Sequence, residues 1–293
     1  MADARIVLLA DRGVVAVTGE DALGFLDNLI TNDMSLLERQ EALHAGLLTP
    51  QGKILFEMFV VPRPEGYWLE TGREKVPDLI RRLMLYKLRA RISVNDLSSN
   101  HGVVAAWDGS PPVSPLSIAF ADPRAERLGK RLLMPSAMAE KLADNMSAIA
   151  DYHRHRITLG VPEAGRDYAL GDSFPHEADF DIFNGVSFTK GCFVGQEVVA
   201  RMQHKAVVRK RVVRIGGAGP LAAGADVTLG AATVGSVGSV SGNIGLAMLR
   251  LDRIVEAITK GEAVLAGGVP ITVDAEALTR YRASVAERAG SNP

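Results

Sequence analysis

The chain has 293 residues, 47% of them hydrophobic, which is typical of a globular protein with one large core or several smaller ones. Its 33 basic and 34 acidic residues leave a formal charge of −1, so no global field favours nucleic acid or anionic lipid. The single cysteine excludes an internal disulfide and a cluster site of four thiolates within the chain. No apolar run approaches the ~20 residues of a membrane span, and we expect a reducing, cytoplasmic compartment.

The first elements are short β runs followed by a helix. Residues 5–19 predict two β runs joined by a turn at Asp11, Arg12 and Gly13. Thr18 is the expected N-cap of a helix, because the apolar residues behind it recur at a spacing of three to four up to Ile30.

A hairpin is predicted next. Residues 42–48 and 53–61 are apolar runs, and Pro50 and Gly52 between them are typical turn residues. A strand over 67–71, a helix over 74–87 and a strand at RISVNDLS complete this region. Strands interleaved with two helices favour an α+β layer over a doubly wound parallel sheet.

The pattern of predicted elements changes twice after residue 100. Short β runs with proline-bearing turns occupy 102–135, residues 137–159 are mostly helical, and 160–180 predict a long loop of the kind that is often functional. After Lys205, β runs punctuated by glycine predict a small barrel or sandwich. We therefore place a domain boundary near residue 206. Residues 1–205 form the first region, in which 100–150 belong to a second subdomain, and 206–285 form the barrel. Residues 286–293 are a tail, and we expect the chain to be frayed from Arg282 onward.

The most informative stretch is SFTKGCFVGQEVVAR, residues 187–201, which contains the only cysteine. A helix predicted from Gly195 places Cys192 just before a helix N-terminus, where the macrodipole favours an anion. Lys190 adds a positive charge, and both effects favour the reactive thiolate. Gly191 and Gly195 would allow unusual φ values close to a ligand. A lone cysteine is more often a small buried hydrophobe, and these residues alone leave both readings open.

Gln196 and Glu197 fall in the first turn of this helix. Their side chains either cap the helix or bind the edge of a heterocycle, and the sequence does not separate the two roles.

KGCFVGQE resembles the K-G-C-[YF]-x-G-Q-E signature of the YgfZ family, folate-binding relatives of the glycine-cleavage T-protein that include a mitochondrial iron–sulfur assembly factor. Further similar segments are FLDNLITND, LLTPQGKILFEMFV, LGVPEAG with FPHEADFD, and GLAMLRL in the C-terminal part. The resemblance implies an α+β fold with ferredoxin-like layers around a central channel, followed by a small C-terminal β-barrel.

The family also implies a function and a site. Tetrahydrofolate or a one-carbon derivative would bind in the channel, and the protein would assist iron–sulfur cluster assembly or repair and, indirectly, tRNA modification, as a monomer with iron–sulfur proteins or assembly factors as partners. Carried over by position, the reactive groups are Cys192 and Lys190, and the folate-binding residues are Asn32, Asp33, Glu177, Gln196, Glu197 and Arg201. Glu177 suits the pterin edge, while Arg201 or Lys205 suits the glutamate tail, although solvated surface is the commoner fate of such cations.

Two alternative functions remain beside this one. A tetrahydrofolate-dependent aminomethyltransferase is disfavoured, because the Asp-Asp pair of that enzyme aligns with Phe56 and Glu57 and a base must reach its amine. A tRNA- or partner-binding module rests on the basic run around Arg209 and Arg211, whose neighbours in a strand point to opposite faces. We expect no metal site, because His153 and His155 diverge on a helix while His176 and His204 are distant.

Overall fold

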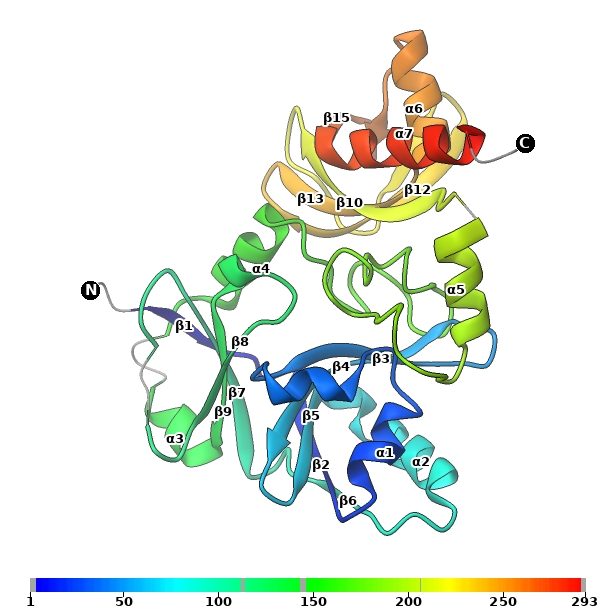
Figure 1. Ribbon diagram of the computed structural model, residues 1–293. Coiled ribbons are helices and arrows are strands. Elements are labelled where there is room, and N and C mark those ends of the chain that lie inside the picture. The colour runs from blue at the N-terminus through cyan, green and yellow to red at the C-terminus, as the bar shows by residue number, and fades with distance from the viewer. Residues whose placement is uncertain (1–3, 112–113, 143–145, 206, 291–293) are drawn as a thin grey trace. The chain divides into compact units, whose positions relative to one another are not determined.

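The computed structural model describes residues 4–111, 114–142, 146–205 and 207–290. The chain forms two compact units, one of Met1–Tyr152 with Phe180–Gln196 and one of His153–Asp179 with Glu197–Pro293 (Figure 1). Among the described residues, no helix combines the length and the apolar character that crossing a bilayer requires. The predicted boundary falls on residue 206, outside the described residues, and stays a prediction.

The first unit contains a five-stranded antiparallel sheet in the order β3-β4-β5-β2-β6. Its strands are β2 (Arg12–Thr18), β3 (Leu43–Leu48), β4 (Ile54–Arg63), β5 (Gly66–Gly72) and β6 (Ser93–Asp96). The predicted hairpin is confirmed: the turn closes with a hydrogen bond from the Thr49 amide to the Lys53 carbonyl, and Gly52 adopts a φ of 80°. Only glycine takes that conformation without strain.

Helices α1 (Ala22–Asp27) and α2 (Val76–Lys87) cover one face of this sheet (Figure 1). Leu26 of α1 and Leu79 of α2 pack into one core with Met58 of β4, and all three are fully buried. The expectation that Thr18 caps the first helix is wrong. Thr18 is the last residue of β2, where it pairs with Gly66 and Ser93, and the helix begins only at Ala22.

The opposite face of the sheet has its own apolar core, which it shares with a second sheet in the order β1-β7-β9-β8. The strands of that sheet are β1 (Arg5–Leu8), β7 (His101–Trp107), β8 (Ile118–Ala121) and β9 (Lys130–Pro135). The two β runs predicted at the start of the chain are confirmed, but they belong to different sheets. Helices α3 (Ser136–Lys141) and α4 (Ile149–Thr158) confirm the mostly helical segment, of which 143–145 lie outside the described residues.

The second unit contains the predicted barrel, a closed one in the order β10-β13-β12-β11-β14-β15. Its strands are β10 (Lys210–Gly217), β11 (Asp226–Leu229), β12 (Ala232–Ser241), β13 (Ile244–Arg250), β14 (Leu265–Ala266) and β15 (Val269–Val273). Helix α6 (Leu251–Lys260) lies between β13 and β14 in the chain, and α7 (Ala275–Gly290) follows β15. The expectation of a frayed end from Arg282 is wrong, because α7 continues to Gly290. Its first turns bury Ala277 and Leu278 in the barrel core, which anchors the polar turns that follow.

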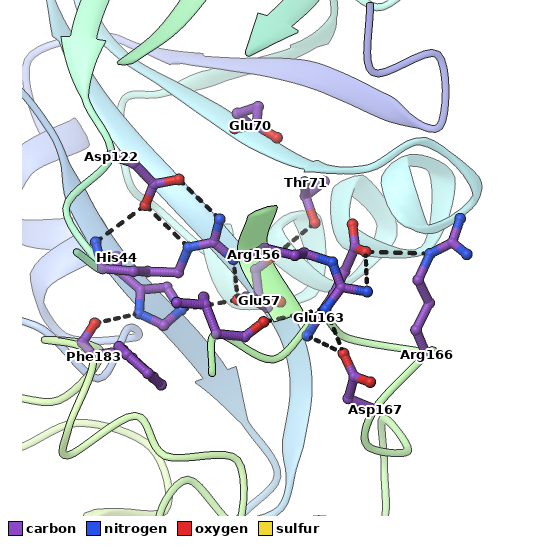
Figure 2. A network of polar contacts seen from close by, with 12 residues as sticks. His44, Glu57, Glu70, Thr71, Asp122, Arg156, Glu163, Arg166, Asp167 and Phe183 are labelled. Carbon is purple, nitrogen blue, oxygen red and sulfur yellow. Dashed lines mark hydrogen bonds and ion pairs between the residues drawn. The ribbon is translucent and has the colours of Figure 1, made fainter. Parts of the chain in front are cut away.

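The predicted long loop between α4 and α5 (Gln196–Lys205) is held to the barrel within the second unit. The fully buried Arg156 binds Asp167 at 2.7 Å and Glu163 at 3.2 Å, contacts that Figure 2 draws. Asp167 in turn accepts a hydrogen bond from the Ser239 amide of β12. Charge-assisted bonds therefore order a segment that has no regular secondary structure of its own.

Candidate functional site

The motif segment is fixed to the first unit by Lys190. The Lys190 ammonium donates to the backbone carbonyls of Asp27, Ile30 and Asn32 at 2.6, 3.1 and 2.8 Å, and it lies 3.2 Å from the Asp27 carboxylate. Its side chain is only 2% exposed, and this burial lowers the pKa of Lys190. These contacts satisfy carbonyls at and just past the end of α1, so Lys190 links two segments that are distant in the sequence.

Gly195 fixes the same segment at its other end. It adopts a φ of 80°, and a Cβ atom there would lie 2.6 Å from the Thr49 carbonyl oxygen in the hairpin turn. The close approach that the sequence predicted for this glycine is therefore to the protein's own backbone. The expectation of an unusual φ at Gly191 is wrong, and nothing lies within 4 Å of a Cβ built there.

Cys192 lies between these two anchors, in an exposed position. It precedes α5 by four residues, and a turn closed by a hydrogen bond from the Gln196 amide to the Phe193 carbonyl separates it from the helix. The reading of this cysteine as a small buried hydrophobe is wrong. A thiol exposed on a segment held at both ends is accessible to partners while its backbone stays in place.

A cavity of about 610 Å³ borders the motif segment within the first unit. Its volume lies in the range of about 300–1,000 Å³ that small-molecule sites occupy. It is lined by the segment Val186–Thr189 and by Asn32, Leu36, Gln40, Glu41, Ala42, Ala121, Pro123 and Asn184. Phe188 offers an exposed aromatic ring, and Glu41 offers the only carboxylate among these lining residues. A planar heterocycle with amine and amide groups matches these two features.

Asn32 shapes the cavity rather than reaching freely into it. Its side-chain amide donates to the carbonyls of His44 and Asn184, at 2.8 and 2.7 Å, and its oxygen accepts from the Asp33 amide. Asn184 adopts a φ of 55°, and its side chain donates to the Pro123 carbonyl. Three walls of the cavity are thereby bonded to one another. Such a cavity exists before any ligand arrives, which lowers the ordering cost of binding.

Beneath this wall lies a buried network of charged side chains that the sequence did not predict. His44 of β3 contacts the Phe183 carbonyl with Nδ1 at 2.8 Å and the Glu57 carboxylate with Nε2 at 3.0 Å (Figure 2). A carbonyl only accepts, so Nδ1 donates. Burial alone would raise the pKa of Glu57, but the hydrogen bond from His44 and the charges of Arg124 and Arg12 hold that pKa below its ordinary value.

The network continues across both sheets of the first unit. Arg124 binds Asp122 through two hydrogen bonds of 3.0 and 2.8 Å, and Arg131 reaches Asp122 at 3.1 Å and Glu70 at 2.8 Å. Arg12 also pairs with Glu70, while Arg131 donates to the Tyr152 hydroxyl. The guanidinium groups of Arg12, Arg124 and Arg131 all lie within 6 Å of the Phe59 ring centre, where cation–π attraction adds to the ion pairs.

Of the residues predicted for the site, only Asn32 is among those that line the cavity, and the set divides between the two units. Lys190, Cys192, Asn32, Asp33 and Gln196 belong to the first unit, whereas Glu177, Glu197 and Arg201 belong to the second. Asp33 caps a short 3-10 helix (Met34–Glu38), and its hydrogen bond from Ser35 lowers its pKa.

The second-unit residues have local partners or face solvent. The Glu177 carboxylate accepts from the Phe174 amide, Glu197 and Arg201 are exposed on α5, and the Lys205 side chain lies outside the described part of the structure. Within the described residues, no group of three or more His, Cys, Asp or Glu is placed to hold a metal ion.

The fold and the barrel both have known counterparts. A crystal structure of the glycine cleavage system aminomethyltransferase T from Bartonella henselae superposes with a TM-score of 0.74 at 16% identity, over 93% of this chain and 85% of that one. A family model described as the CAF17 C-terminal beta-barrel domain matches residues 209–280. The predicted T-protein-like α+β fold with a C-terminal barrel is thus confirmed.

Curated relatives match most of the chain. It is 32% identical over 296 residues to the Homo sapiens protein named "Iron-sulfur cluster assembly factor IBA57, mitochondrial", covering 89% of this chain and 83% of that protein. It is 34% identical to the Mycosarcoma maydis homologue over 71% of the chain, but it spans only 56% of that relative's length. The expectation of a cytoplasmic location is wrong, because these relatives are named as mitochondrial proteins.

Proposed function

The chain belongs to the family of the IBA57 iron–sulfur cluster assembly factors, and from this premise we propose that it assists the assembly or repair of iron–sulfur clusters on partner proteins. The observation that carries the proposal is the match to relatives named for this function over nearly the whole chain, which includes both units. In this role Cys192 is the reactive group. Its exposure on an anchored segment supports transient contact with a partner's cluster or thiol.

A cell-based assay tests this function. In a strain lacking its own family member, the chain is expected to restore the activity of iron–sulfur enzymes, and Cys192→Ser at native expression is expected to lose most of that effect because serine does not form a thiolate. Cys192→Ser should unfold at the parent temperature, since the side chain is exposed. Full rescue by Cys192→Ser would refute the role of the thiol, whereas no rescue by the parent chain would refute the assembly function.

We further propose that the cavity beside the motif segment binds tetrahydrofolate or a one-carbon derivative. Three features support this: the volume of about 610 Å³, the exposed Phe188 ring for stacking, and the Glu41 carboxylate, which accepts from the Ala121 amide through Oε2 and has a second oxygen for a pterin edge. Glu177, which the sequence suggested for that edge, already accepts a hydrogen bond from the Phe174 amide and stays a proposed contact.

Isothermal titration with tetrahydrofolate and its methylene and formyl forms measures this binding. Ala121→Trp fills the cavity from an exposed lining position and is expected to raise the Kd at least about tenfold, because a ligand and an indole cannot share the space. Leu116→Trp is the matched control, since Leu116 is 70% exposed and does not line the cavity. Equal affinity in the two variants would place the ligand elsewhere, and no binding by the parent would refute the proposal.

Aminomethyl transfer ranks second. Phe56 lies in the apolar core, and the Glu57 carboxylate is held by His44 with its pKa below the ordinary value. A carboxylate in these contacts is a weaker and less accessible base than the transfer reaction needs.

A role in tRNA modification is proposed only as an indirect consequence of cluster assembly. Direct binding of tRNA would rely on the basic run around Arg209 and Arg211, and Arg211 is already bound by Asp179 at 2.8 Å.

A further inference from the structure

Helix α2 exposes apolar side chains at its C-terminal end. Met84, Leu85 and Leu88 are 47, 66 and 89% exposed, although Leu79 and Leu83 on the other side of the helix are completely buried. Leu88 follows Leu85 by three residues and Met84 by four, a spacing that makes side chains neighbours on a helix surface. Three neighbouring exposed apolar side chains on one helix end are more than the scattered single ones of an ordinary surface.

Leu88 has a second unusual property. It ends α2 with φ 42° and ψ −106°, a conformation in which glycine is the favoured residue. Strained backbone of this kind clusters at sites that bind or switch. The leucine side chain gains no burial in return within the chain, so its use is expected to be contact with another molecule.

A cavity of about 490 Å³ lies next to this helix, between α1 and α2. It is lined by Glu20, Asp21, Leu23, Gly24, Phe25, Asn28, Leu29, Tyr86 and Ala90. Leu23 is 53% exposed, and nothing lies within 4 Å of a Cβ built at Gly24. The cavity therefore has apolar walls and room for an inserted side chain.

The same region carries a strong local positive charge in a chain whose formal charge is −1. Residues 76–91 contain five cations and a single carboxylate: Arg81, Arg82, Lys87, Arg89 and Arg91 against Asp78. Arg81 pairs with Asp78, and Arg91 pairs with Glu20 and Asp21 at the cavity rim. Arg82, Lys87 and Arg89 have no ion-pair partner in the described part of the chain.

We propose that α1, the C-terminal end of α2 and the residues up to Arg91 form a docking surface for a partner protein that presents an acidic segment with exposed leucine-like side chains. An apolar side chain of the partner enters the cavity between the helices, and Leu85 and Leu88 pack beside that side chain. Arg82, Lys87 and Arg89 bind the acidic groups of the partner. The surface is separate from the cavity lined by Val186–Thr189, and the two cavities share no lining residue.

The combination of features favours a protein over the other anionic partners. RNA or DNA would pair with the cations but would leave exposed leucines uncovered. A flat lipid surface would cover the leucines but would leave the cavity between the two helices unfilled. A hollow with apolar walls, whose two carboxylates are bound by Arg91, next to a helix end with three unpaired cations matches an amphipathic acidic helix that inserts anchor residues into a groove.

The test uses the full chain and a fluorescein-labelled amphipathic peptide with leucines along one helical face and glutamates elsewhere. Fluorescence anisotropy is expected to show saturable binding, and the Arg82→Glu/Arg89→Glu variant is expected to weaken it at least about tenfold. Gly24→Glu should have a similar effect by filling the cavity with a negative charge, while Gly24→Ala, for which there is open space, should bind as the parent does.

Leu88→Gly separates docking from folding. Because glycine fits the Leu88 backbone, this variant is expected to keep its Tm within about 3 °C of the parent and still to bind the peptide several-fold more weakly. Parent-like binding by Leu88→Gly and by the charge reversal would overturn the proposal. So would tighter binding to phosphatidylglycerol vesicles or poly-uridylate than to the acidic peptide, and so would equal binding of a peptide with lysine in place of glutamate.

Discussion

Replacing Arg131 with methionine is expected to lower the free energy of unfolding by about 3–5 kcal/mol, the largest effect we predict for a single substitution. Arg131 is 3% exposed and joins two carboxylates, Asp122 just after β8 and Glu70 in β5. Methionine fills a similar volume but leaves the network with more negative than positive charge, and the remaining carboxylates have no water to compensate them. Urea unfolding followed by far-UV circular dichroism measures the change.

The control is Arg5→Met, which removes an exposed ion pair with Asp151 and should cost less than about 1 kcal/mol. If the two variants lose equal free energy of unfolding, the buried network stabilises the protein no more than an exposed ion pair does.

The same network makes stability depend on pH in a defined direction. Burial raises the pKa of Asp122, but the charges of Arg124 and Arg131 outweigh it and leave that pKa below the ordinary 3.8. A carboxylate with a depressed pKa in the folded state contributes stability that is complete above its unfolded pKa and is lost as the pH falls below it. The difference between the parent and Arg131→Met should therefore shrink from neutral pH toward pH 3, as the carboxylates take up protons.

Replacing Lys190 with methionine is expected to have the second-largest effect, a loss of about 2–4 kcal/mol. The variant leaves the carbonyls of Asp27, Ile30 and Asn32 without the ammonium that satisfies them. The segment that carries Cys192 should open locally more often, because one of its two anchors is gone. Chymotrypsin is then expected to cleave after Phe188 or Phe193 faster than in the parent, and urea unfolding gives the free energy.

Lys130→Met serves as the control for this variant, since Lys130 is exposed on β9. If Lys190→Met and Lys130→Met unfold alike and are cleaved at the parent rate, Lys190 does not hold the segment, and a direct electrostatic role beside Cys192 becomes the better account.

Local patterns predicted most of the fold. The Thr49–Gly52 turn, the apolar runs beside it and the glycine-rich strands of the barrel carry their structure in neighbouring residues, so the sequence indicated them correctly. The predictions were wrong where contacts between residues distant in the sequence determine the secondary structure. Thr18 has the chemistry of an N-cap, but pairing with Gly66 and Ser93 keeps it in a strand. At the C-terminus, burial of Ala277 and Leu278 against the barrel orders a helix whose later residues look polar and small.

The site divides in the same way. The motif placed Lys190, Cys192 and Gly195 correctly beside a helix, yet the contacts of Lys190 lie some 160 residues earlier in the chain. The buried network joins residues as distant as Glu70 and Arg131, and no local pattern reveals such pairing. One signal was present: Glu57 is a lone carboxylate within the apolar strand ILFEMFVV, and a charge inside a buried strand requires a partner.

The closed barrel of the second unit restricts how that unit can meet other proteins. Its first strand, β10, pairs with both β13 and β15, so the ring of backbone hydrogen bonds has no free margin. A visiting chain has no place to join as an additional strand, which removes a common route to both peptide capture and fibril growth. Recognition by this unit must therefore rely on side chains and loops rather than on the backbone of a sheet edge.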